Sequence, residues 1–278
     1  MKLEFPNNNE SFTKSELEIL DFIELNKEEF LFMTIGEISE ALSISDATIS
    51  RFSKKVGCDD FKSLKTLVMS QIQYNGSVAV DKMTQTLKKS EDFTVTDYLK
   101  FQQQNIQRTL EYLNPEEFNN SAVEMTKVRK IWVYGKHAAK SLSILLKTRL
   151  SRLGINIEIL PSGGTELIEA LENITKEDMV IIFSFLKLSV EGKILLDYEK
   201  DIGFKLLLFN SRIHFPEEDL VDFNIYVYRG PANEYHSHSS TVAVIDGLVV
   251  KISEVLGQDS INRLEKIKQI KNKYKNYK

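Results

Sequence analysis

The sequence predicts an all-α helix-turn-helix N-terminal domain followed by an α/β domain with a five-stranded parallel sheet flanked by helices. The first observation is that residues 34–57 show two short amphipathic patterns separated by a tight turn. The second is that five short, apolar, β-rich runs follow at intervals of about 25 residues, with helix-length segments between them. Strands that alternate with helices form parallel sheets, because parallel neighbours need a crossover connection. A length of 278 residues, 42% of them hydrophobic, fits two soluble domains.

The two patterns at residues 34–57 have clear helix boundaries. Thr34 and Glu37 form a capping box, Ser45 can cap the second helix by accepting a backbone N–H bond, and Gly57 can end it in a left-handed conformation. Two such helices are typical of a helix-turn-helix whose second helix enters the DNA major groove, and a plain helical hairpin in a core is the alternative. The apolar residues expected to face inward are Ile35, Ile38, Ala41, Leu42, Ala47, Ile49, Phe52 and Val56.

The outward face of the second helix carries the candidate DNA contacts. Residues 1–75 are acidic overall, with eight Lys and Arg against thirteen Asp and Glu, a net charge of −5. Residues 51–65, however, hold five basic residues against two acidic ones, so a local basic face can bind DNA phosphates. The candidates for base or phosphate contacts are Ser45, Asp46, Thr48, Ser50, Arg51, Lys54, Lys55, Lys62 and Lys65.

Two more helical patterns complete the N-terminal domain. Thr13 and Glu16 form another capping box, which begins a helix expected at residues 13–25. A further helix is expected at residues 61–74, and the Asn-Gly-Ser sequence that follows predicts a turn that ends this helical module. The expected division is a helix-turn-helix domain at 1–75, a linker with some helix at 76–96, and an α/β domain at 97–278.

The α/β domain is expected to begin with helices and to end with a basic one. Its nearly continuous apolar strands fit a sheet that is covered on both faces. The final segment, residues 261–278, holds seven Lys and Arg and one Glu; it reads as a solvated helix, with a second nucleic-acid contact as the alternative. The strands are expected at 130–134, 156–160, 179–183, 205–209 and 224–228, and the helices at 97–112, 115–125 and 242–255.

The composition excludes several classes of protein. Cys58 is the single cysteine, which excludes an internal disulfide framework and a CxxC metal site, and we expect it to be buried beside Gly57. The first residues lack the basic and apolar regions of a signal peptide, and no apolar run approaches the length of about 20 residues that a membrane span needs. We therefore expect a cytoplasmic protein with no membrane partner and no cofactor.

The N-terminal motif resembles a known family. The run SISDATISRFSKKVGCDDFKSLK, residues 43–65, is similar to the DNA-reading segment of the RpiR family of bacterial transcriptional regulators. These proteins join an N-terminal helix-turn-helix to a C-terminal SIS (sugar isomerase) domain, so the resemblance covers nearly the whole chain. The residues on the family's characteristic positions are Ser45, Thr48, Arg51, Phe52, Gly57, Phe61 and Lys65.

The two loops that resemble the SIS phosphate loops depart from the family pattern. The G-x-G-x-S loop keeps Gly135, but His137 replaces the second glycine and the serine is lost. The S-x-S-G-x-T loop keeps Ser184, whereas Leu186 and Lys187 replace serine and glycine. Glycine is needed where backbone must approach a phosphate closely, so these changes put the phosphate site in question. The effector-binding candidates implied by the resemblance are Gly135, Lys136, His137, Ser141, Ser184, Lys187, Ser189, His236 and Ser240.

The resemblance implies a homodimeric regulator of sugar or amino-sugar metabolism that binds double-stranded DNA at a palindromic operator. A sugar-phosphate-like effector at the SIS domain would modulate that binding. One alternative is a degenerate SIS domain that serves only as a dimerisation platform, and another is a sugar-phosphate isomerase. The His236 and His238 pair could chelate a metal, but further ligands are missing nearby in sequence, and a polar loop before a helix is the simpler reading.

Overall fold

The chain folds into two compact units, each with its own hydrophobic core. The first unit contains residues 1–105 together with 212–215 and 229–237, and the second contains the remaining segments. The computed structural model describes residues 5–7, 12–71, 78–88, 93–213, 220–231 and 234–275.

The first unit begins with five helices in close succession. They are α1 (Lys14–Leu25), α2 (Lys27–Phe32), α3 (Ile35–Leu42), α4 (Asp46–Lys55) and α5 (Phe61–Gln71), and α6 (Val78–Lys88) follows. Thr13 and Thr34 each form the predicted capping box, at the start of α1 and α3. These local signals place the helix starts correctly, because a cap satisfies backbone N–H groups that have no partner within the helix.

The core of the helical region gathers one apolar side from each of several helices. Ile19 and Ile23 of α1, Ile38 of α3 and Phe52 of α4 are fully buried, and they belong to one contiguous cluster. The cysteine at position 58 lies in the same cluster with 7% of its surface exposed, and burial raises the pKa of its thiol. The predicted burial of Cys58 is therefore confirmed.

The second unit is built around a parallel sheet. Its strands are β1 (Ile131–Gly135), β2 (Ile157–Ile159), β3 (Met179–Phe183), β4 (Lys205–Asn210) and β5 (Phe223–Tyr226), in the spatial order β2-β1-β3-β4-β5. All four neighbouring pairs are parallel. The predicted five-stranded sheet is confirmed, although β5 begins one residue earlier and ends two residues earlier than expected.

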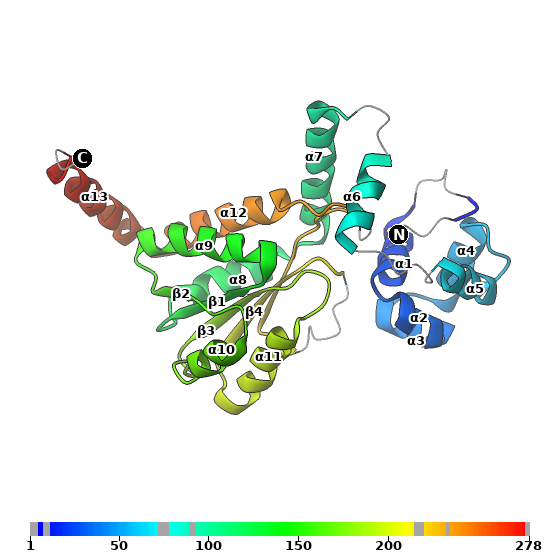
Figure 1. The fold of residues 1–278 in the computed structure, drawn as a ribbon, viewed down its shortest axis with the longest axis horizontal. Coiled ribbons are helices and arrows are strands. Elements are labelled where there is room, and N and C mark those ends of the chain that lie inside the picture. Colours follow the sequence, from blue (N-terminus) through cyan, green and yellow to red (C-terminus); the bar gives the residue numbers. More distant parts are fainter. Residues whose placement is uncertain are drawn as a thin grey trace. The chain divides into compact units, whose positions relative to one another are not determined.

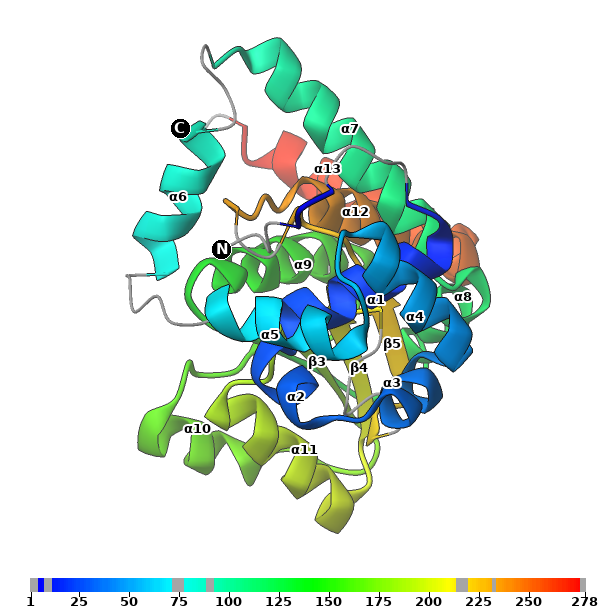
Figure 2. The ribbon, with the colours of Figure 1, turned by 90° about the vertical axis from the view of Figure 1, so that its right-hand side faces the viewer.

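Helices cover both faces of this sheet. In Figure 1, α8, α9 and α12 lie on one face, and α10 and α11 lie on the other; Figure 2 shows the same division after the quarter turn. Neighbouring side chains of a strand point to opposite faces, and every residue of β1 and β3 is buried. The helix bounds are α7 (Val95–Tyr112), α8 (Pro115–Met125), α9 (Lys140–Leu153), α10 (Gly164–Leu171), α11 (Val190–Ile202), α12 (Ser239–Leu256) and α13 (Gln258–Lys273), with a short 3₁₀ turn η1 (His137–Ala139).

A buried carboxylate ties the amino-terminal ends of the sheet together. Asp178 precedes β3, its side chain is fully buried, and Arg129 donates to it through Nε at 2.9 Å and Nη2 at 2.6 Å. Trp132 Nε1 and the Thr175 backbone N–H also donate to it. Burial alone would raise the pKa of Asp178, but these hydrogen bonds outweigh burial and lower it. The charged form is therefore the stable one in the fold.

Replacing Asp178 with asparagine is expected to destabilise the second unit by about 2–3 kcal/mol, because charge-assisted hydrogen bonds are lost in a buried site. A group whose pKa is lowered by folding contributes stability above its unfolded pKa of about 4, and this contribution is lost as pH falls through the folded value. Wild type and Asp178→Asn should therefore converge in stability at low pH. Denaturant titrations followed by Trp132, the single tryptophan, measure this, and a gap that is constant from pH 7 to pH 3 would contradict the assignment.

Candidate DNA-binding and ligand sites

The helices α3 and α4 form the predicted helix-turn-helix. Ser43 ends α3 in the left-handed conformation, with φ of 52°. Ser45 then caps α4, because its side chain accepts a hydrogen bond from the Thr48 backbone N–H. Gly57 follows α4 with φ of 88°, and a Cβ at this position would lie 2.7 Å from Cβ of Pro6. The cap at Ser45 and the left-handed Gly57 are both as predicted.

One part of the predicted packing is wrong. Ile49, Phe52 and Val56 are fully buried, as expected for the inward side of α4. Ala41 and Ala47, which were expected to pack inward, are exposed. A methyl side chain gains little from burial, so the larger apolar residues decide which side of each helix faces the core. Ala47 therefore belongs to the outward surface of α4.

The outward surface at the start of α4 is a short polar network. The Ser45 and Thr48 hydroxyls lie 2.9 Å apart, and Arg51 donates through Nη2 to the Thr48 hydroxyl at 3.3 Å. Ser45, Asp46 and Arg51 are exposed, whereas Thr48 and Ser50 are half-buried. A surface of hydroxyl and guanidinium groups at the start of a second helix is what base and phosphate contacts need.

The basic residues of this region differ in the exposure of their side chains and in the contacts that their charged groups make. Lys54 and Lys62 are exposed. Lys55 forms an ion pair with Glu16 of α1, with 2.8 Å between Nζ and Oε2. Lys65 Nζ lies 5.2 Å from the centre of the Phe61 ring. The charge of Lys55 is thus already balanced within the protein, which the sequence could not reveal because its partner is 39 positions away.

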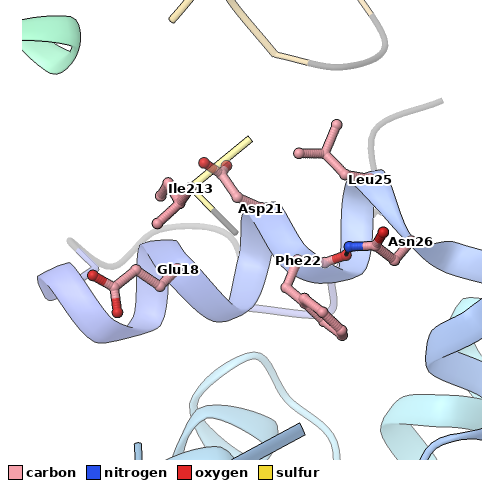
Figure 3. Close-up of a pocket in the computed structure, with 6 residues that line it drawn as sticks. All are labelled: Glu18, Asp21, Phe22, Leu25, Asn26 and Ile213. Atoms are coloured by element: carbon pink, nitrogen blue, oxygen red, sulfur yellow. Dashed lines mark hydrogen bonds between the residues drawn. The ribbon is translucent and has the colours of Figure 1, made fainter. Parts of the chain in front are cut away.

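A small hollow lies along α1 in the first unit. Figure 3 shows Glu18, Asp21, Phe22 and Leu25 on this helix with Ile213 beside them, and Asn26 completes the lining. None of the predicted site residues lines this hollow. It is bordered by two carboxylates, which is the wrong charge for either DNA or a phosphate.

The second candidate site lies at the carboxyl ends of the strands. The strand order reverses between β1 and β3, and Gly135 is the register partner of Phe183. The loops that follow these two strands therefore begin side by side. In open α/β sheets, ligands bind outside the carboxyl ends of the strands where the strand order reverses. Both loops chosen from the sequence meet at this position.

The first loop keeps a tight backbone despite its substitutions. A Cβ on Gly135 would lie 2.7 Å from the Ala139 carbonyl oxygen and 2.8 Å from the Ser143 hydroxyl, so only glycine fits. His137 has φ of 52°, a left-handed conformation that is costly for a residue with a side chain. His137 thus adopts a backbone conformation that glycine adopts more easily, at the position where the resembling sequence pattern has glycine. Ser141 is exposed and donates to the Ala138 carbonyl oxygen.

The hydroxyl groups of the second loop form hydrogen bonds with other groups of the protein. Ser184 donates to the Lys187 carbonyl oxygen at 2.8 Å, and Lys187 itself is exposed. Ser189 caps α11 by accepting from the Gly192 N–H at 3.1 Å. The Tyr134 hydroxyl lies 3.2 Å from the Ser189 hydroxyl. These bonds tie the loop to neighbouring parts of the second unit.

An ion pair that the sequence did not predict joins the first loop to the first turn of α11. Lys136 Nζ lies 2.7 Å from Oε1 of Glu191, and the Tyr134 hydroxyl donates to Oε2 of Glu191 at 3.3 Å. Hydrogen bonds from Lys136, from the Glu191 backbone N–H and from Ser189 lower the pKa of Glu191 to about 2. The same contact raises the pKa of Lys136. The signal for Glu191 in the sequence was its position two residues after a helix cap, where an acidic side chain meets the helix dipole.

The last two candidate residues have different surroundings. His236 lies in the first unit, with Nδ1 3.2 Å from Lys82 Nζ and Nε2 3.1 Å from the Pro231 carbonyl oxygen. Burial and the nearby charge of Arg229 lower the pKa of Lys82 to about 8. Ser240 is buried in the first turn of α12 in the second unit. These contacts of His236 with Lys82 and Pro231 lie within the first unit.

Nowhere in the described ranges do three or more His, Cys, Asp or Glu side chains gather in a group able to hold a metal ion. No helix in those ranges is long and apolar enough to cross a membrane.

The sequence is similar to those of HTH-type transcriptional regulators. Residues 2–75 match the family described as "Helix-turn-helix domain, rpiR family". An uncharacterized HTH-type transcriptional regulator of Caldanaerobacter subterraneus is 24% identical over 270 residues, which cover 94% of this chain and 93% of the relative.

Solved structures match in fold. The sugar isomerase domain of an RpiR transcription factor from Sphaerobacter thermophilus aligns with a TM-score of 0.58 and 18% identity, over 63% of this chain and 97% of that one. The Vibrio vulnificus NanR protein, solved in complex with ManNAc-6P, aligns with a TM-score of 0.55 and 16% identity over 95% of both chains. The sheet unit of this chain therefore has the fold of a sugar isomerase domain.

Proposed function

This chain belongs to the RpiR family of helix-turn-helix transcriptional regulators, and from that premise we propose that it is a homodimer that binds a palindromic operator under the control of a sugar-phosphate-like effector. The genes that it regulates would serve sugar or amino-sugar metabolism. The proposed division of labour assigns DNA binding to residues 1–75, a linker role to 76–96, and effector binding and dimerisation to 97–278.

The observation that carries the DNA-binding role is the outward surface of α4. Ser45, Thr48 and Arg51 are linked by hydrogen bonds, and they extend from the N-cap to the middle of α4 at intervals of three residues. Two copies related by a two-fold axis would place two such helices in major grooves about one helical turn apart, or a multiple of it. The exposed Lys54 and Lys62 would bind phosphates beside them.

The effector role is supported by fold and position together. The loops after β1 and β3 lie where the strand order reverses, and the related NanR structure holds an N-acetylmannosamine 6-phosphate at 16% identity. Ligand binding would favour one of two arrangements of the dimer through its differential affinity for them. The proposed effector contacts remain Gly135, Lys136, His137, Ser141, Ser184, Lys187, Ser189, His236 and Ser240.

A specific observation favours a second candidate, in which the C-terminal domain only dimerises. The hydroxyl of Ser184 donates to its own loop and Ser189 caps α11, so both are engaged without a ligand. Catalysis with Glu191 as the general base is disfavoured on chemical grounds. A general base works best with a pKa near the working pH, and the pKa of Glu191 is lowered to about 2.

Selection from random DNA duplexes, followed by calorimetry with phosphosugars, tests the proposal. A regulator should select one palindromic sequence, and N-acetylmannosamine 6-phosphate or a related sugar phosphate should change the affinity for it. Selection without a palindromic motif would contradict the operator role. A motif whose affinity no phosphosugar changes, with no heat of binding, would favour the dimerisation platform. Interconversion of aldose and ketose phosphates by the protein would establish the isomerase instead.

A further inference from the structure

The place where a phosphate would bind at the reversal of strand order is surrounded by groups that attract anions. Ser189, the cap of α11, and the backbone N–H of Glu191 stand at the start of a thirteen-residue helix. Helix N-termini bind anions through free N–H groups and the helix dipole. The start of α10 is also close, because a Cβ on Gly163 would lie 2.9 Å from Oε1 of Glu191.

The anion at this position is part of the protein itself. The Glu191 carboxylate accepts hydrogen bonds from its own backbone N–H and from Ser189. Lys136 reaches across from the first loop and binds Oε1 at 2.7 Å. With 17% of its side chain exposed, Glu191 is enclosed on most sides. One carboxylate thus uses the donors that a phosphate would need, and one lysine balances its charge.

We propose that Glu191 is an intramolecular occupant of the phosphate position and that Lys136 is its counter-ion, so that an anionic effector binds by displacing the Glu191 carboxylate. This inference rests on the proposed effector function. The displaced carboxylate leaves Lys136 and the α11 N-terminus to the ligand. The pair therefore selects ligands, because only a group that binds Lys136 and α11 more strongly than a carboxylate does, such as a phosphate dianion, replaces it.

Charge-neutral substitution tests the proposal directly. Glu191→Gln keeps the size of the side chain and removes the competing charge, and Ser189 still caps the helix. Calorimetry with inorganic phosphate is expected to show binding at least tenfold tighter than in the wild type. Glu172→Gln, at the opposite end of the neighbouring helix α10 and exposed, is the matched control and should change nothing.

Substitution of the counter-ion Lys136 is expected to have the opposite effect on phosphate binding. Lys136→Met removes the charge that a phosphate would gain, so phosphate binding should weaken. The double variant Glu191→Gln with Lys136→Met should lose most of the tenfold gain, since the freed lysine is its source. Phosphate binding by Glu191→Gln that is equal to or weaker than the wild type, or absent in both, overturns the proposal.

A measurement on the wild-type protein tests the displacement without relying on the folding of any variant. Carboxyl carbon NMR of labelled glutamates, recorded above neutral pH where phosphate is largely a dianion, follows the chemical shift of the Glu191 carboxylate beside Lys136. Saturating phosphate should move this chemical shift toward that of an exposed glutamate, because the carboxylate loses its cation. An unchanged chemical shift with phosphate bound would show that no displacement occurs.

These outcomes separate the inference from the function on which it rests. If N-acetylmannosamine 6-phosphate changes operator affinity in the wild type while Glu191→Gln brings no gain, the effector role stands and the displacement is wrong. If Glu191→Gln gains phosphate affinity but no sugar phosphate alters operator binding in either protein, the occupied anion position stands and the effector role fails.

Discussion

Alanine in place of Arg51 is expected to weaken binding to the selected operator by roughly ten- to a hundredfold per subunit, in line with the about 1–3 kcal/mol that a specific arginine contact contributes. The guanidinium is exposed and bonded to the Thr48 hydroxyl, so it already points along the surface that we assign to the major groove. Affinity for unrelated DNA should fall much less, because phosphate contacts elsewhere remain.

Electrophoretic mobility assays with operator and scrambled duplexes measure this difference. Lys54→Ala is the matched comparison, since Lys54 lies one turn further along α4 and is exposed as well. A lost phosphate contact should weaken both duplexes alike and reduce the salt dependence by about one ion. If Arg51→Ala leaves the operator footprint unchanged at physiological salt, the assignment of α4 to the major groove is wrong.

Replacement of Phe52 by alanine is expected to destabilise the helical region by about 3–5 kcal/mol, the usual cost of a large cavity in a core. The Phe52 ring is completely buried. Its centre lies 6.2 Å from that of Phe5 and 6.0 Å from that of Phe12, so one substitution removes two aromatic contacts. Because a typical domain is stable by only about 5–15 kcal/mol, this substitution removes a large part of the stability of the region.

Circular dichroism and tryptophan fluorescence distinguish destabilisation of the helical region from unfolding of the whole chain. Trp132, the single tryptophan, lies in β1 of the second unit and reports on that unit alone. The helical unfolding transition of Phe52→Ala should move to lower denaturant concentration, while the Trp132 unfolding transition stays in place. Phe52→Leu, which leaves a smaller cavity, should be much milder. A shifted Trp132 transition in Phe52→Ala would mean that the two units unfold together.

The sequence by itself determined the features that local interactions control. Caps at Thr13, Thr34 and Ser45 and the left-handed glycine at position 57 could be predicted because each involves backbone within four residues. The parallel sheet was predictable because apolar strands at regular intervals leave few other ways to bury them. The family resemblance then supplied the loops worth examining.

Only the tertiary structure decided which charges are free and which are already used. Lys55 forms an ion pair with Glu16, Arg129 with Asp178, and Lys136 with Glu191. The partners in these pairs are 39, 49 and 55 positions apart, and no periodicity or spacing in a single sequence encodes which distant groups meet. The strand order that brings the loops of β1 and β3 together is likewise a property of the folded sheet.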